Sequence, residues 1–331
     1  MRQILHKKNW FFVAFILLVG SLKFSVLSNY FGLNMANYRL NTLVNRPIYS
    51  LPTTVSPPPI LNLTINNSSN TNLNIGFRHA NANFALVRDD EQTAINLWRE
   101  LPESELRLFY YSELARKAML YEASLQWLKW GELVQPEIGD WVYWQAILHQ
   151  EMNNLDIAYT YAERSLKLPL QHIGYSDIYY FIGSILSQTQ ISPASDSISY
   201  YKQALSLNQF QEQANQINSY FDLAETFRNL GEDEQAIINY LNVLQLNPAH
   251  YSANLWLGSL YWKVEQDFEA ATEYLNEAIS LEPNRKWAYR NLATILQERG
   301  NIQDAAALYQ TVLKIDPNDT FAQQQLKRLN E

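Results

Sequence analysis

Three stretches near the end of the chain share one pattern: QAIINYLNVLQLNP (235–248), AATEYLNEAISLEP (270–283) and DAAALYQTVLKIDP (304–317). Their last residues, Pro248, Pro283 and Pro317, are 35 and 34 residues apart. Each stretch has a small alanine as its second residue and reads as a helical run, and proline ends such a helix because it lacks an amide donor. The pattern therefore predicts a helix that recurs with a period of 34 to 35 residues.

A second set of markers lies upstream of each stretch and has nearly the same spacing. The pairs are Leu223-Ala224, Leu257-Gly258 and Leu292-Ala293, which are 34 and 35 residues apart. The alanines of the first set, Ala236, Ala271 and Ala305, are 35 and 34 apart. The two sets disagree by one position, so we expect one extra residue between Tyr261 and Ala271, in the turn that joins two helices. Each repeat is thus predicted to be a helix, a turn and a second helix.

This order of small, large and turn-forming residues resembles the tetratricopeptide repeat. In residues 217–250, the matching positions are Tyr220, Leu223, Ala224, Phe227, Gly231, Ala236, Tyr240, Leu244 and Pro248. Small residues let the two helices approach closely, and large ones fill the spaces beside them. The resemblance implies an all-α fold, a right-handed superhelical solenoid of stacked antiparallel helix pairs. It also implies a concave face, lined by first helices, that binds peptides or proteins.

The resemblance covers roughly three quarters of the chain but weakens toward the N-terminus. We expect a repeat domain over residues 77–331, with the clearest repeats at 176–319 and a capping helix at 320–331. Six or seven helix pairs fit into this length. In the early pairs, tryptophans take the place of smaller residues: Trp98, Trp127, Trp130, Trp141 and Trp144.

The first 28 residues have the pattern of a membrane-targeting segment. Arg2, Lys7 and Lys8 precede an uncharged, largely apolar run from Trp10 to Leu22. No clear small-x-small cleavage site follows, so we predict an uncleaved signal anchor, a single transmembrane helix. A cleaved signal peptide and a buried soluble helix are the alternatives. The basic N-terminus predicts that the repeat domain lies on the extracytoplasmic side of the membrane, or is secreted if the segment is cleaved.

Residues 29–76 are predicted to be an extended, polar and proline-rich linker. Pro47, Pro52 and the triplet at 57–59 disfavour helix. Apolar residues alternate at 61–65 and 73–77, so two short strands are the alternative to an extended tether.

Composition and motifs point away from catalysis. The net charge is −8, which argues against nucleic acid as a partner, and the chain has no cysteine. Phosphate-binding loops, zinc-protease motifs and serine-hydrolase elbows are missing from the sequence. The five histidines are far apart in sequence, so we predict no metal site, no cofactor and no catalytic residue. The chain is therefore predicted not to be an enzyme.

The concave face of the predicted repeats supplies the candidate binding site. Helical spacing places one stripe of side chains from each first helix on this face. The predicted groove consists of Tyr143, Tyr180, Phe221, Arg228, Leu255, Trp262, Lys263 and Arg290. Apolar anchors with nearby cations would suit an extended segment with some acidic character.

The function predicted from the sequence is a membrane-tethered scaffold or adaptor that binds a protein or peptide partner of unknown identity. An accessory protein for polysaccharide or cell-envelope assembly is the first alternative, because exposed aromatic rings also stack on sugars. An uncharacterised enzyme is the second alternative. These predictions rest on the fold, which serves many different processes.

Overall fold

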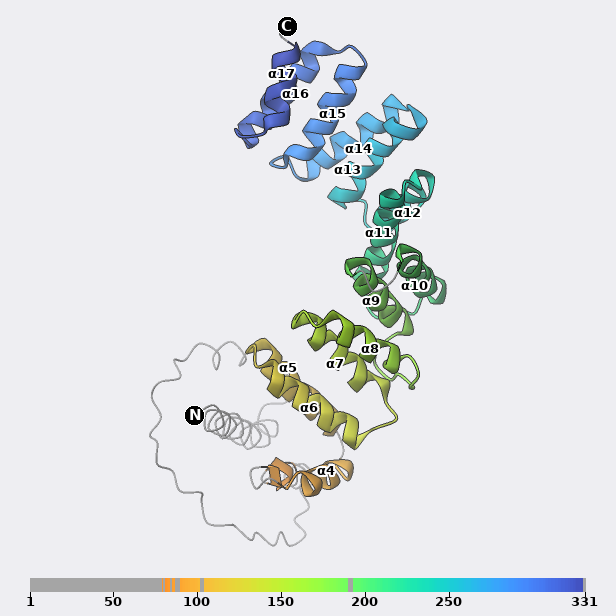
Figure 1. The fold of residues 1–331 in the computed structure, drawn as a ribbon, viewed down its shortest axis with the longest axis vertical. Coiled ribbons are helices and arrows are strands. Elements are labelled where there is room, and N and C mark those ends of the chain that lie inside the picture. Colours follow the sequence, from red (N-terminus) through yellow and green to blue (C-terminus); the bar gives the residue numbers. More distant parts are fainter. Residues whose placement is uncertain are drawn as a thin grey trace, which may run out of the picture. The chain divides into compact units, whose positions relative to one another are not determined.

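The computed structural model describes residues 79, 81–83, 85–86, 90–101, 104–189 and 193–329. The predicted anchor at 1–28 and the predicted linker at 29–76 lie outside these residues. The chain divides into two compact units, Met1–Asn154 with Lys167–Pro169, and Leu155–Leu166 with Leu170–Glu331. In the described part of the chain every regular element is a helix (Figure 1).

The first unit holds four of the described helices: α4 (Glu91–Arg99), α5 (Ser104–Lys117), α6 (Tyr121–Val134) and α7 (Gly139–Glu151). Its core is built around Trp98, which is 1% exposed and lies 6.0 Å from the ring of Trp127 and 5.8 Å from that of Trp130. Gly131 provides the space for another indole, because a Cβ there would come within 2.6 Å of the Trp141 ring. Trp98, Trp127, Trp130 and Trp141 are thus core residues, and Gly131 of α6 makes room for Trp141 of α7.

The second unit continues as a series of helices that pack in sequence order (Figure 1). They are α8 (Leu155–Ser165), α9 (Tyr175–Gln188), α10 (Ala194–Leu207), α11 (Gln213–Leu230), α12 (Asp233–Leu246), α13 (Tyr251–Leu260), η1 (Tyr261–Glu265), α14 (Phe268–Leu281), α15 (Lys286–Glu298), α16 (Ile302–Ile315) and α17 (Thr320–Leu329). Helices α9, α11, α13 and α15 are first helices, and each packs against the second helix that follows it. The all-helical, repeat-like fold predicted from the sequence is confirmed. Helices α7 and α8, which follow one another in the chain, belong to different units.

Close packing within each pair depends on a small residue in the first helix and a large one in the second. Tyr201, Tyr240 and Tyr309 occupy equivalent positions in α10, α12 and α16 and are fully buried. In the middle pair Leu275 takes this position, and Gly258 lies directly against it. A Cβ on Gly258 would stand 2.5 Å from the Leu275 Cγ atom and 2.9 Å from the Ala271 carbonyl oxygen. The small residues of the repeat are therefore required by helix-to-helix distance.

The turn between first and second helix uses a left-handed residue in three consecutive pairs. Gly231 and Gly300 have φ angles of 79° and 83°, which glycine adopts without steric cost. In the middle pair Gln266 takes this place with a φ of 54°. The extra residue predicted between Tyr261 and Ala271 is absorbed just before it, in the π-helical turn η1. Such turns accommodate one additional residue without breaking the helix.

The last helix, α17, closes the described end of the series. Phe321, Leu326 and Leu329 pack against a core of Ala293, Ala305, Tyr309, Val312 and Ala322. Among the residues that the structure describes, no helix combines the length and hydrophobicity needed to cross a membrane.

Candidate functional site

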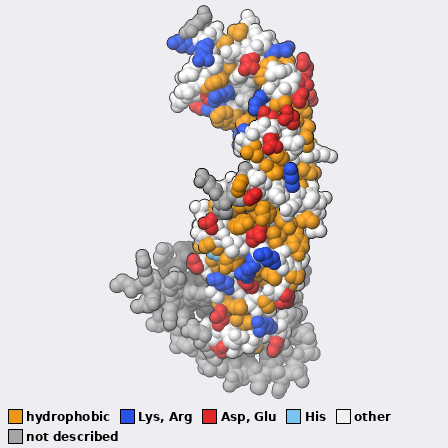
Figure 2. Space-filling model, turned by 45° about the vertical axis from the view of Figure 1, so that its right-hand side comes forward, with side chains coloured by type: hydrophobic (Ala, Val, Ile, Leu, Met, Phe, Trp, Pro, Cys, Tyr) orange, Lys and Arg blue, Asp and Glu red, His pale blue; other side chains and the backbone are white. Residues whose placement is uncertain are grey.

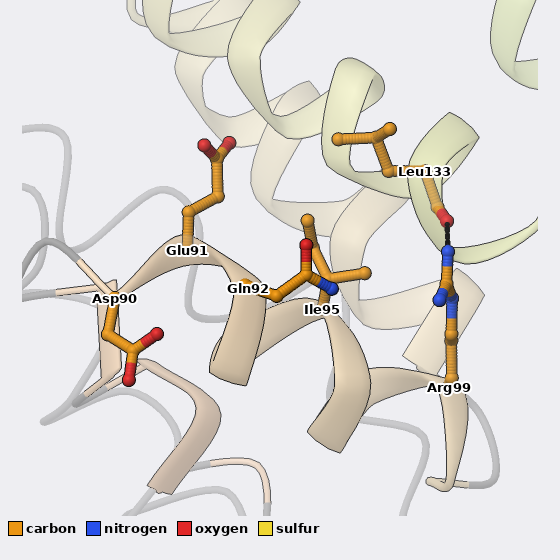
Figure 3. Close-up of a pocket in the computed structure, with 6 residues that line it drawn as sticks. All are labelled: Asp90, Glu91, Gln92, Ile95, Arg99 and Leu133. Carbon is orange, nitrogen blue, oxygen red and sulfur yellow. Dashed lines mark hydrogen bonds between the residues drawn. The ribbon is translucent and has the colours of Figure 1, made fainter.

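A depression in the first unit lies at the start of α4, where Figure 3 shows Asp90, Glu91, Gln92, Ile95, Arg99 and Leu133. Its volume is about 420 Å³. Asp90 caps the helix by accepting a bond from the Thr93 amide, and hydrogen bonds from the Thr93 side chain and from this amide lower the pKa of Asp90. Arg99 donates to the Leu133 carbonyl oxygen at 2.7 Å, and the Trp130 indole donates to Glu91. Helix capping and packing explain these polar groups, so the depression is not a strong candidate for a binding site.

The first helices of the second unit carry a more informative surface. We call it the first-helix face and define it by Tyr180, Asp222, Arg228, Trp256, Trp262, Trp287 and Arg290. Figure 2 shows hydrophobic side chains at the molecular surface, mixed with charged side chains of both signs. On the first-helix face such mixtures occur as small, ordered groups of a carboxylate, an aromatic ring and a cation.

The first group joins α11, α12 and α13. Arg228 pairs with Glu225 at 2.6 Å, and its guanidinium lies 4.0 Å from the centre of the Trp256 ring. The Tyr240 hydroxyl donates to the other oxygen of Glu225. Burial and the neighbouring carboxylate both raise the pKa of Tyr240, so its hydroxyl keeps its proton. The arginine is held on both sides, by an ion pair and by a cation–π contact.

The second group joins α15 to the start of α17. Arg290 lies 3.9 Å from the centre of the Phe321 ring and 3.9 Å from the carboxylate of Asp319. Lys286 pairs with Asp319 at 2.8 Å and with Asp316 at 2.6 Å. Burial would raise the pKa of Asp319, but its bonds to Lys286 and to the Ala322 amide hold it below the usual value. These contacts hold the last helix against α15, and they also occupy part of the first-helix face.

The π-helical turn η1 sets the positions of two predicted groove residues. The Trp262 indole reaches forward and donates to Glu298 at the end of α15. Lys263 reaches back and pairs with Asp233 at the start of α12, at 2.6 Å. One inserted residue thus directs two consecutive side chains to the repeats on either side.

Asp222 differs from these carboxylates. It lies on α11, where Tyr180 of α9 approaches it and Tyr201 of α10 is close enough to be affected by its charge. In the described residues no lysine or arginine forms an ion pair with it. Burial raises the pKa of Asp222 to about 6 from its ordinary 3.8, the hydrogen bond from Tyr180 opposes this rise, and the charge of Glu225 adds to it.

The structure distributes the predicted groove residues unevenly. Tyr143 lies in α7 of the first unit and is 8% exposed. Leu255 is 7% exposed and packs with Leu275 and Leu292 in the core between repeats. Phe221 contacts the rings of Tyr240 and His250 at centroid distances of 5.7 and 4.9 Å. Partly or largely accessible members of the predicted groove are Tyr180, Phe221, Arg228, Trp262, Lys263 and Arg290.

The residues predicted from the sequence did not include Asp222, Trp256 or Trp287. Each directly follows or lies near a predicted position, and a helix face about 100° wide includes such neighbours. Trp287 is 49% exposed and lies near two cations, with Lys286 5.0 Å and Arg290 5.5 Å from its ring centre. A wider face drawn on each first helix would have included all three. The predicted groove itself stays a prediction.

Among the described residues, no group of three or more histidine or acidic side chains is placed to hold a metal ion. The pKa of His149 and that of His250 are both lowered, in each case chiefly by burial.

Comparison with known proteins identifies the class of repeat. Models of the tetratricopeptide repeat match residues 221–286 and 265–329. The chain therefore contains tetratricopeptide repeats, and proteins built from such repeats generally mediate protein–protein interactions.

Relatives among curated proteins share only part of the chain. An uncharacterised protein named ycf37, from Guillardia theta, is 30% identical over 115 residues, which cover 33% of this chain and 64% of that protein. A BBSome complex member BBS4 homologue of Drosophila melanogaster is 25% identical over 147 residues, which cover 43% of this chain and 30% of that protein. The chain thus spans less than two thirds of the length of each.

Solved structures agree on the fold. YrrB, described as a tetratricopeptide repeat protein with an unusual peptide-binding site, is 16% identical, with 60% of this chain and 97% of YrrB covered and a TM-score of 0.52. PilF of Pseudomonas aeruginosa is 13% identical, with a TM-score of 0.53, and the match covers 69% of this chain and 97% of PilF. At these identities the likeness concerns the fold alone.

Proposed function

We propose that this chain is a membrane-tethered scaffold whose first-helix face binds a partner protein or peptide. The observation that carries the proposal is Trp287, a large aromatic side chain that is half exposed although Lys286 and Arg290 hold it in place. Tryptophan and arginine are the residues that most often dominate the energy of protein interfaces. A half-exposed indole with two cations around its ring is suited to such contact.

The order already present on this face supports the same function. Arg228, Trp262 and Arg290 are each fixed by an ion pair, a hydrogen bond or a cation–π contact to another helix. A partner would therefore meet side chains whose conformational freedom has already been lost on folding. Such preorganisation lowers the entropic cost of binding.

The tether and its orientation rest on the sequence. Arg2, Lys7 and Lys8 followed by the apolar run to Leu22 support an uncleaved anchor within residues 1–28. The basic flank would stay in the cytoplasm, which would place the repeats outside it. The proposed role is then to recruit a partner to a machine of the cell envelope.

Affinity capture from gently solubilised membranes tests the binding face. The double variant Trp262→Ala, Trp287→Ala removes two aromatic side chains from it. The matched control, Ile238→Ala with Leu241→Ala, removes two exposed apolar side chains, 52% and 36% exposed, from the second helix α12. Circular dichroism and the unfolding midpoint establish that all three proteins fold.

We expect a partner that the wild type and the α12 variant capture and that the tryptophan variant loses. Equal capture by all three proteins would contradict the first-helix face. A glycan array with the same proteins covers the polysaccharide alternative, because sugar binding that depends on Trp262 and Trp287 would replace a protein partner with a carbohydrate.

The tether is tested separately. Alkaline carbonate extraction should leave the intact chain in the membrane and release a chain that begins at residue 29. Protease added outside sealed cells or vesicles should digest the repeats only if they lie on the extracytoplasmic side. Release of the intact chain by carbonate would refute the anchor.

A further inference from the structure

Charge is divided sharply along the chain. Residues 1–88 contain eight lysines and arginines and no acidic residue, whereas residues 89–331 contain 17 basic and 33 acidic residues, a net charge of −16. The repeat-bearing part is therefore strongly acidic. A surface of one sign favours partners of the opposite sign, both in the rate of encounter and in the choice of partner.

The first-helix face already shows how it holds an arginine. Arg228 is placed between the carboxylate of Glu225 and the ring of Trp256, and Arg290 lies near Asp319 and over the ring of Phe321. Both arrangements combine an ion pair with a planar stack, for which the guanidinium group is suited. The chain itself supplies the cation in both.

Asp222 is a third carboxylate on the same face, where it is half-buried and accepts a hydrogen bond from Tyr180, but its charge balance is different. The groups that face it are Tyr180 of α9, Tyr201 of α10 and Glu225 of α11, and Asn218 of α11 bonds to Tyr180 in turn. None of these is a cation, and Glu225 is itself neutralised by Arg228. A carboxylate that is largely removed from water without a cation costs free energy, which an incoming cation would recover.

We propose that the first-helix face binds a protein segment whose arginine side chain pairs with Asp222 and packs against Tyr180. This inference rests on the function proposed above and names the chemistry of the partner. The predicted groove was expected to suit a segment with some acidic character, so the inferred partner has the opposite charge from the expected one. The cations expected to attract acidic groups, Arg228, Lys263 and Arg290, are paired within the chain, to Glu225, Asp233 and Asp319 respectively.

Selection from a library of random 12-residue peptides, displayed against the full chain at pH 7.5, tests the inference. The targets are the wild type, Asp222→Asn and the control Glu277→Gln, which removes an exposed acid from the second helix α14. We expect arginine to be enriched at one position of the selected peptides for the wild type and the control, and the enrichment to be lost with Asp222→Asn.

A selected peptide is then compared with a copy in which citrulline replaces that arginine, because citrulline keeps the shape and removes the charge. The wild type should lose about tenfold or more in affinity, and Asp222→Asn should lose little. Affinity of the wild type should also fall roughly tenfold from pH 7.5 to pH 5, as Asp222 becomes protonated, while the Asp222→Asn variant should show a smaller change.

Selected peptides without an arginine preference, or equal binding of the citrulline copy to the wild type, would overturn the inference. If such peptides still require Trp262 and Trp287, the proposed binding face stands and only the chemistry of the partner is wrong. Failure to enrich any peptide on the wild type would count against both.

Discussion

Replacing Asp222 by asparagine should make the protein more stable at neutral and alkaline pH. The pKa of Asp222 is about 6 in the folded chain, against an ordinary value of 3.8. Each unit of such a difference corresponds to about 1.4 kcal/mol, so ionised Asp222 would cost the folded state at most about 3 kcal/mol. The side chain remains partly open to water, which reduces the expected cost to about 2 kcal/mol. Asparagine keeps the shape and the ability to bond Tyr180 but carries no charge.

The sign of the pH dependence follows from the raised pKa. Above pH 6 both folded and unfolded wild type carry the ionised group, and the full cost is present. As the pH falls from 6 toward 4, the folded state binds a proton first, and the wild type gains on the variant. The variant should therefore exceed the wild type by about 2 kcal/mol at pH 8 and by little at pH 4.

Urea unfolding at pH 8, 6 and 4, followed by far-ultraviolet circular dichroism, measures this difference. Repeat proteins can unfold in parts, so hydrogen exchange of the α11 amides should accompany the midpoints. Glu277→Gln controls for the loss of one negative charge. A variant less stable than the wild type at pH 8, or a difference that does not change with pH, would refute the reasoning.

Three further predictions concern packing and turns. Gly258→Ala should lower the unfolding free energy by about 1–3 kcal/mol, because the added Cβ would collide with Leu275 and the Ala271 carbonyl. Gly231→Ala should lower it by only about 1 kcal/mol, because no atom lies within 4 Å of the added Cβ and the cost comes from the positive φ alone. Gln266→Gly should raise the unfolding free energy by about 0.5 kcal/mol, because glycine adopts the positive φ without strain, although a hydrogen bond to the Trp262 carbonyl is lost. The urea midpoint measures all three variants. A larger loss in Gly231→Ala than in Gly258→Ala, or a loss in Gln266→Gly, would contradict the argument. Trp98→Ala should cost about 3–5 kcal/mol and remove most of the near-ultraviolet signal of its indole cluster, and a loss below 1 kcal/mol would show that Trp98 is not central to the core.

Much of the fold could be predicted from particular residues. Gly231, Gly300 and the prolines at 248, 283 and 317 act on their own stretch of backbone, so their meaning does not depend on distant parts of the chain. The one-residue mismatch before Ala271 predicted where the π-helical turn would be found. Nothing in the sequence predicted that the helices on either side of residue 154 would belong to two different units.

The candidate site was predicted less well. Helical spacing placed Leu255 on the groove, yet it is buried in a core with Leu275 of its own helix pair and Leu292 of the next. Trp256, one residue further, carries the stacked Arg228. One residue turns a helical side chain by about 100°, and spacing alone cannot give the crossing angle that decides which of the two is covered.

The sequence by itself determined the period, the helix pairs and their turns, because these follow from local backbone preferences and from the sizes of side chains within one repeat. Only the tertiary structure decided which charges are already paired and which is not. Arg228 is stacked by Trp256 of the next repeat and Arg290 by Phe321 of the last helix, while Asp222 is enclosed by the tyrosines Tyr180 and Tyr201 of the preceding repeat and meets no cation among the described residues. These contacts join residues 21 to 42 positions apart, and their balance of charge and burial exists only once the repeats have stacked.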